Sequence, residues 1–121
     1  MSNAEAAEGS MALSLHAVLL WVLRELPDQS VAQDLYAQSA VATVAAGLPT
    51  MVELTVPPSC EPARVPNGPL PVRAVAVDAQ GSPMGEVLVW VSDGYLSTIE
   101  YAWYTDEAPT ELPRASQLRH E

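Results

Sequence analysis

The fold is decided by residues 85–113, GEVLVWVSDGYLSTIEYAWYTDEAPTELP. Two runs of apolar, β-prone residues, 86–92 and 95–104, flank the pair Asp93-Gly94. An Asp-Gly pair between two such runs is a strong hairpin signal, because a type I′ turn requires positive φ at both central residues. We therefore predict a tight antiparallel hairpin at this point of the chain.

Further strands are predicted upstream of the hairpin. Residues 72–78 precede it in meander order, and Met51–Val56 alternates with a period of two, which places Val52, Leu54 and Val56 inward. The proline-rich segment 57–71 between these strands predicts an extended surface loop.

Two helical segments precede the strands. An apolar stripe with helical spacing predicts a helix from Ala12 or Leu15 to Leu26, closed by Pro27. Ser30 is predicted to open a second helix through a capping box with Gln33.

The end of the second helix is ambiguous in the sequence. Residues 39–46 are compatible with helix through their alanines and with strand through Val41, Thr43 and Val44. We favour a strand from about Val41.

The predicted fold class is α+β, with one or two N-terminal helices packed on an antiparallel sheet of about five strands. Residues 1–10 are predicted to be a disordered leader, in which Ser2-Asn3-Ala4 resembles the remnant of a cleaved expression tag. Residues 11–113 form the single domain, and 114–121 form a C-terminal tail. Coil is expected beyond Asp106.

Composition narrows the classes of function. The chain carries 15 acidic and 5 basic residues, a net charge of −10, which argues against binding to nucleic acid or to an anionic membrane. The apolar run 12–23 is too short to span a bilayer and lacks the basic leader of a signal peptide. We therefore expect a cytoplasmic protein.

No catalytic constellation is recognisable. Cys60 lies alone in a proline-rich loop without an activating neighbour, and His16 and His120 have no partner at a readable spacing. Ser92 and Ser97 flank the hairpin turn, which explains them structurally. We expect no cofactor and no metal ion, and we favour a role other than catalysis.

The aromatic and acidic residues of the last third are a candidate interaction surface, namely Trp90, Tyr101, Trp103, Tyr104, Glu100, Asp106 and Glu107. For the acidic members, a merely solvated edge is the simpler interpretation. Because the strand 86–92 is apolar on both faces, the sheet face opposite the helices needs a cover. The proline loop, the C-terminal tail and a second subunit are the alternatives.

Two classes of function follow from these patterns. The first is a protein that binds another protein or a copy of itself. A homodimer would be built on the sheet or on its last strand, 95–104, unless residues 105–118 fold back as a lid, and an inhibitor of the immunity or antitoxin type fits the size and acidity. The second is a small-molecule binder or enzyme whose pocket, between the first helix and the sheet, is lined by Trp21, Trp90 and Trp103.

The stretch Val89–Glu100, VWVSDGYLSTIE, followed by Glu111-Leu112-Pro113, resembles the C-terminal signature of a family of small uncharacterised bacterial proteins. In that family an apolar strand, a DG turn, an L-S-x-L-E strand and a terminal LP follow an N-terminal helix. Its members often carry a Cys-Gly-Cys-Pro turn where this chain has 45–49, AAGLP, so a metal or redox role does not transfer. The resemblance implies a fold and no activity.

Overall fold

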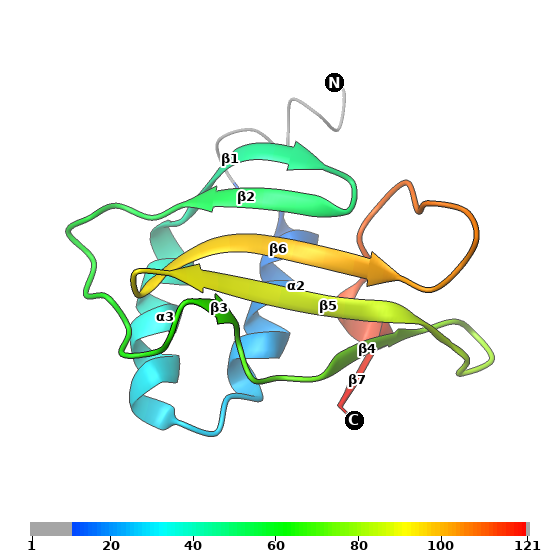
Figure 1. The fold of residues 1–121 in the computed structure, drawn as a ribbon, viewed down its shortest axis with the longest axis horizontal. Coiled ribbons are helices and arrows are strands. Elements are labelled where there is room, and N and C mark those ends of the chain that lie inside the picture. Colours follow the sequence, from blue (N-terminus) through cyan, green and yellow to red (C-terminus); the bar gives the residue numbers. More distant parts are fainter. Residues whose placement is uncertain (1–10, 121) are drawn as a thin grey trace.

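The computed structural model describes residues 11–120, so the predicted leader lies outside the described residues. Two helices, α2 (Leu13–Arg24) and α3 (Gln29–Val41), lie on one face of an antiparallel seven-stranded sheet (Figure 1). The strands are β1 (Thr43–Leu48), β2 (Met51–Thr55), β3 (Gly68–Pro69), β4 (Ala74–Val77), β5 (Pro83–Ser92), β6 (Tyr95–Trp103) and β7 (Leu118–His120), with a 3-10 turn, η1 (Ala115–Gln117), before β7. The α+β prediction is confirmed, with more strands than the expected five.

The sheet is built around the predicted hairpin. Its strand order is β1-β2-β6-β5-β4-β7, and β3 pairs with the end of β5 beside β4. Asp93 and Gly94 form the two-residue turn between β5 and β6 with φ values of 52° and 85°. Positive φ at both positions confirms the predicted type of turn. β6 lies in the centre of the sheet, paired on both sides.

A single hydrophobic core fills the space between the helices and the sheet. The helical stripe contributes Leu19, Leu23 and Leu35, and alternate residues of β5 contribute Val87, Val89 and Val91. Val52 and Leu54 of β2 also point into this core, as their period-two spacing predicts, while Val56 is only half-buried. Removal of these apolar side chains from water is the main force that holds the two layers together.

The second helix begins earlier than predicted. Its N-cap is Asp28, whose carboxylate accepts hydrogen bonds from the N–H groups of Ser30 and Val31 and from the Ser30 hydroxyl. The capping box predicted at Ser30 is therefore wrong. Aspartate is as good an N-cap as serine, and Asp28 lies two residues before Ser30, in the short connection that follows the end of α2 at Arg24.

Replacing Asp28 with asparagine, which does not titrate, is expected to change how stability depends on pH. The Ser30 hydroxyl, then the Val31 and Ser30 N–H groups, hold the pKa of Asp28 below its usual range. Because that pKa is lowered in the folded state, the stabilisation is present above the usual aspartate pKa and is lost as pH falls through the lowered value. The melting-temperature advantage of the wild type over Asp28→Asn should therefore shrink as the pH falls below about 5 and be lost below the lowered pKa.

Asp28→Ala provides the control for the cap itself. It removes the acceptor and should lower the melting temperature by a few degrees near neutral pH, where Asp28→Asn keeps an acceptor. A constant difference between wild type and Asp28→Asn over the whole pH range would contradict this role of the carboxylate.

The ambiguous segment after Gln38 is divided between helix and strand. α3 continues to Val41, and β1 begins at Thr43. The strand favoured from about Val41 is thus confirmed to within two residues. β1 forms a hairpin with β2 through Pro49-Thr50.

The C-terminal segment contains regular structure that was not predicted. Coil beyond Asp106 is wrong for the last residues, because η1 forms at 115–117 and β7 pairs with β4 at the sheet edge. Leu112 packs against the core, together with Ala115, and η1 contacts α2. The segment therefore folds toward the helix side of the sheet.

The tip of the hairpin is held by the side chain of Gln38, which is fully buried. Its Nε2 donates to the carbonyl oxygens of Glu61, at 3.0 Å, and Gly94, at 2.8 Å, and its Oε1 accepts from the N–H of Leu96 at 2.9 Å. The N–H of Ala63 also donates to the Gly94 carbonyl. We call this set of contacts the hairpin clasp, since it ties α3 and the loop 57–67 to the β5–β6 turn.

Candidate functional site

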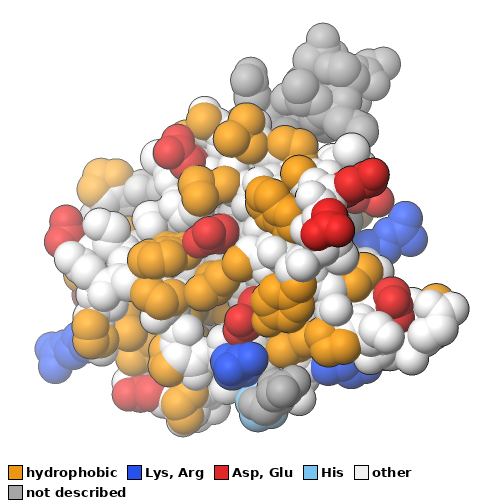
Figure 2. Space-filling view, turned by 45° about the vertical axis from the view of Figure 1, so that its right-hand side comes forward, with side chains coloured by type: hydrophobic (Ala, Val, Ile, Leu, Met, Phe, Trp, Pro, Cys, Tyr) orange, Lys and Arg blue, Asp and Glu red, His pale blue; other side chains and the backbone are white. Residues whose placement is uncertain are grey.

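The sheet face opposite the helices, called the outer face below, carries the strongest candidate for a functional surface. It consists of the residues that alternate with the core residues of the three central strands, namely Met51 and Glu53 of β2, Thr98, Glu100 and Ala102 of β6, and Glu86, Leu88 and Trp90 of β5. In Figure 1 the strands lie in front of the helices, so this face points toward the viewer. Figure 2 shows hydrophobic and acidic side chains interspersed over it.

Strand register arranges these residues in rows across the sheet. Met51 stands opposite Glu100, which stands opposite Leu88. In the neighbouring row Glu53 stands opposite Thr98, which stands opposite Trp90. Each carboxylate thus has apolar or neutral cross-strand neighbours, at the distances where side chains interact.

Trp90 and Glu100 form the centre of the outer face. The indole Nε1 of Trp90 donates a hydrogen bond of 2.9 Å to Glu100 Oε1 across the two strands. Both side chains are half-buried. The hydrogen bond uses one carboxylate oxygen and holds the indole and the carboxylate in a fixed relation.

A second polar group lies at the end of the face near β4. Glu86 forms an ion pair of 2.9 Å with Arg73 and accepts a hydrogen bond of 3.0 Å from the Tyr104 hydroxyl. Within residues 11–120 the only other contact of this kind places His120 Nε2 3.9 Å from Glu25 Oε1, and it is an ion pair only when the imidazole is protonated. Neither Glu53 nor Glu100 therefore lies in an ion pair with another described residue.

The predicted interaction residues do not all reach this face. Trp90 and Glu100 lie on it, and Tyr104, which is 54% exposed, reaches it through Glu86. The prediction that Tyr101 belongs to the interaction surface is wrong. Its side chain is 5% exposed and lies in the core with Ile99, so it offers no surface to a partner. Its burial raises the pKa of its phenol.

The other three predicted residues lie beyond the centre of the outer face. Trp103 ends β6 and is 39% exposed. Asp106 and Glu107 are exposed in the loop after β6, where Thr105 donates to the Glu107 carbonyl. Glu53, Met51 and Leu88 were missed as surface candidates, although the period-two pattern of 51–56 already placed Glu53 outward.

The cover expected for the outer face does not come from the C-terminal segment. Leu112 and Ala115 pack on the opposite side, against the helices and the core. Leu88 and Trp90 are half-buried rather than buried, so the strand that was predicted at 86–92 is fully buried on one face only, although it is apolar on both. Partial exposure leaves apolar area that a partner can cover.

The three tryptophans do not line a common pocket. Trp21 packs against the core from α2, whereas Trp90 lies on the other face of the sheet. Two hollows among the described residues lie elsewhere, one at 77–79 with 111–119 and one at the loop 105–110.

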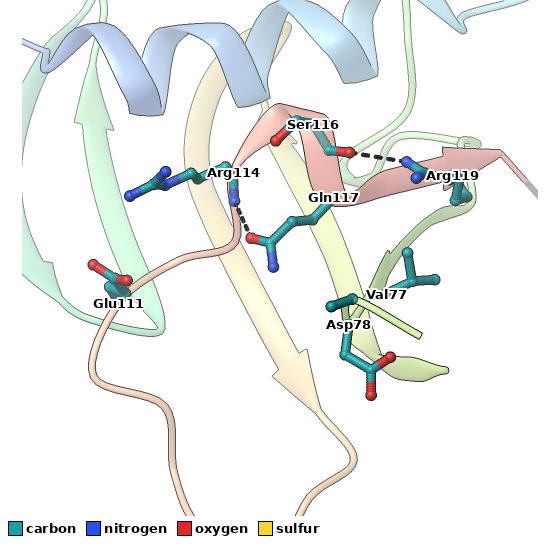
Figure 3. Close-up of a pocket in the computed structure, with 8 residues that line it drawn as sticks. Val77, Asp78, Glu111, Arg114, Ser116, Gln117 and Arg119 are labelled. Carbon is teal, nitrogen blue, oxygen red and sulfur yellow. Dashed lines mark hydrogen bonds between the residues drawn. The ribbon is translucent and has the colours of Figure 1, made fainter. Parts of the chain in front are cut away.

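The first hollow, of about 520 Å³, has polar walls without a convergent site (Figure 3). The guanidinium groups of Arg114 and Arg119 lie apart, and Arg119 donates to the backbone carbonyls of Ser116 and Leu118. Asp78 accepts from the N–H groups of Gln80 and Ser82 within its own turn. The Arg119 guanidinium and the Asp78 carboxylate are therefore occupied in local structure.

The remaining candidate residues do not form a common site. Cys60 is half-buried, and its carbonyl accepts from the Tyr95 hydroxyl. The Nε2 of His16 is buried without a hydrogen-bond partner among the described residues. Within residues 11–120 no group of three or more His, Cys, Asp and Glu side chains is arranged to hold a metal ion.

Searches of protein-family models, curated proteins and solved structures find no match to this chain. In the described part of the chain, no helix has the length and apolar character needed to cross a membrane.

Proposed function

We propose that this protein is a non-enzymatic binding protein of the bacterial cytoplasm that recognises a basic partner protein through the outer face of its sheet. The observation that carries the proposal is the Trp90–Glu100 pair, set among Met51, Leu88 and Glu53 on a face that no described segment covers.

The chemistry of the face defines the partner. Apolar side chains of β2 and β5 supply area whose burial favours association. Glu53 and Glu100 supply negative charge without an ion-pair partner among the described residues. A guanidinium is the best match for a carboxylate beside an indole, because it pairs with the carboxylate and stacks on aromatic rings. The partner surface is therefore expected to present arginine among apolar residues.

A second copy of the chain is a poor partner for the same face. Stacking two outer faces about a two-fold axis would bring Glu53 and Glu100 of one copy toward those of the other. The chain has a net charge of −10, so longer-range repulsion acts in the same direction. Like charges in an interface disfavour association, which leaves a basic heterologous partner as the better match.

An inhibitor of the immunity or antitoxin type is a narrower form of this proposal. An acidic face of this kind suits the basic substrate site of a nuclease, where it would occupy the place of the phosphates. A small-molecule pocket between α2 and the sheet gains no support from the described residues, because Trp90 lies on the far side of the sheet from Trp21.

The proposal is tested with a synthetic peptide of alternating arginine and leucine, about ten residues long, which presents one basic and one apolar face when extended. Amide chemical shifts of the labelled protein should change in β2, β5 and β6 on titration. Glu100→Gln and Trp90→Ala should each weaken binding about fivefold or more, because they remove the charge and the ring at the centre of the face.

Glu111→Gln is the matched control, since it removes the same charge from an exposed loop position away from the outer face. Its affinity for the peptide should stay within about twofold of the wild type. Equal weakening by Glu111→Gln and Glu100→Gln would show that the peptide senses net charge alone. That result, or shift changes confined to the loop 105–110, would overturn the proposal.

A further inference from the structure

The strand β1 forms an edge of the sheet that lacks the usual protection. It pairs with β2 on one side, and on its other side no strand within residues 11–120 pairs with it. Edge strands are normally guarded by charged residues, proline or short length, since their free N–H and C=O groups invite another strand. β1 is six residues long, TVAAGL, without charge or proline.

The opposite edge of the sheet shows the contrast. There the outermost strand, β7, is three residues long and carries Arg119 and His120. β1 instead lies within a run from Leu35 to Val52 that contains no charged residue, in a chain with 20 of them. The two edges of one sheet are thus built differently, and only the β7 edge is guarded by charge.

Exposed apolar side chains lie beside the β1 edge. Leu48, at the end of β1, is 67% exposed and stands opposite Met51, which is 42% exposed. Val41, two residues before β1, is 48% exposed. Three of the six large hydrophobic side chains exposed among the described residues therefore gather at this hairpin and its approach, where a partner strand would cover them.

We propose that β1 pairs antiparallel with β1 of a second copy, so that the two sheets become one continuous sheet. The uncharged edge permits a second copy as the occupant, because two molecules with a net charge of −10 each repel over most of their surface and meet with least repulsion there. A two-fold axis perpendicular to the sheet makes the contact self-complementary, with backbone hydrogen bonds between strands of identical sequence.

This assignment corrects the dimer expected from the sequence. The strand 95–104, considered there as the contact strand, is β6 and is paired on both sides, so it has no free edge. The register of β1 shifts between Val44 and Ala46, which marks a bulge at Ala45. A bulge discourages pairing locally. It leaves Ala46–Leu48 in regular pairing with β2 and thus extended for a second strand.

In such a dimer the two outer faces lie on the same side of the joined sheet. The inference does not depend on the partner proposed above, because it uses a different surface and a different interaction. The two proposals also fail separately: Glu100→Gln tests the outer face, whereas substitutions in β1 test the edge.

Light scattering after size-exclusion chromatography tests the dimer with the full chain. Wild type at about 100 μM should show twice the chain mass of 12.9 kDa. Ala45→Glu should weaken dimerisation about tenfold or more, because Ala45 is exposed near the middle of the edge strand and the two copies would bring equal charges together. Thr55→Glu is the matched control: it adds the same charge at an exposed position of β2, not at the edge, and should keep the dimer.

A charge-swap experiment makes the test sharper. Ala45→Glu and Ala45→Lys should each be largely monomeric, and their equimolar mixture should form a heterodimer, because the opposite charges then face each other. Hydrogen exchange should show those amides of 43–48 that are not bonded to β2 protected in the dimer and exposed on dilution.

Each other outcome overturns the proposal. A wild type that stays monomeric at about 100 μM rejects the dimer, and protection of the β1 amides that are not bonded to β2 would then mean that the chain covers its own edge. A dimer that survives Ala45→Glu and Ala45→Lys but dissociates in Thr55→Glu or Glu100→Arg would place the contact on the outer face instead.

Discussion

Replacing Gln38 with leucine is expected to cost about 2–4 kcal/mol of unfolding free energy. Leucine is close to glutamine in size, so the core stays filled while the hairpin clasp loses all three of its side-chain hydrogen bonds. The N–H of Leu96 then remains buried without its acceptor, and the Glu61 carbonyl loses its donor. Unfolding by urea, followed by circular dichroism, measures the change.

Gln33→Leu is the matched control on the same helix, because Gln33 is exposed. It should change stability by less than about 0.5 kcal/mol. Gln38→Glu separates the effect of size from that of hydrogen bonding. It keeps the shape of the side chain but replaces the NH₂ group, which donates to two carbonyl oxygens, with a carboxylate oxygen that cannot donate. Near neutral pH it should therefore destabilise the protein at least as much as Gln38→Leu does. Equal stability of Gln38→Leu and Gln33→Leu would show that the clasp contributes nothing.

The second large effect is expected for Gly94→Val at the tip of the hairpin. Gly94 has φ +85°, and a Cβ atom there would lie 2.7 Å from both the carbonyl oxygen of Ala63 and Cβ of Pro62. Valine therefore meets backbone strain and a collision with the loop that the clasp holds against the turn. We expect a loss of about 3 kcal/mol or more, measured by urea unfolding.

A substitution at Gly81 separates the effect of backbone strain from that of the collision with the loop. Its φ is +83°, almost the same, but a Cβ atom there would have no neighbour within 4 Å. Gly81→Val should thus report the strain alone and cost about 1–2 kcal/mol. If both variants lose the same free energy, the contact between the loop and the hairpin tip has no part in the effect.

Local patterns in the sequence were sufficient for much of the fold. The Asp93-Gly94 turn, the period-two strand 51–56 and the helical stripe of α2 were all recognised, because each depends on residues near one another in the chain. Together they determined the α+β class. The N-cap of the second helix was predicted at Ser30, and only the structure showed that Asp28 forms it.

Tertiary structure alone decided the elements and sites that depend on distant residues. β7 has three residues and no strand pattern, and it forms because β4 offers it a free edge. Gln38 is an ordinary helix residue in the sequence, yet its partners lie 23 to 58 residues away. Trp90 and Glu100 were both recognised as surface candidates, but their hydrogen bond depends on the register across the hairpin.

The candidate surfaces follow the same division. Period-two alternation in the sequence already directed Glu53 outward and Val52 inward, because the two faces of a strand are a property of the backbone. Which strand becomes an edge, and which face remains uncovered, depends on the order of strands and on the path of residues 104–120. Those are set by packing between segments far apart in the chain, and no local pattern encodes them.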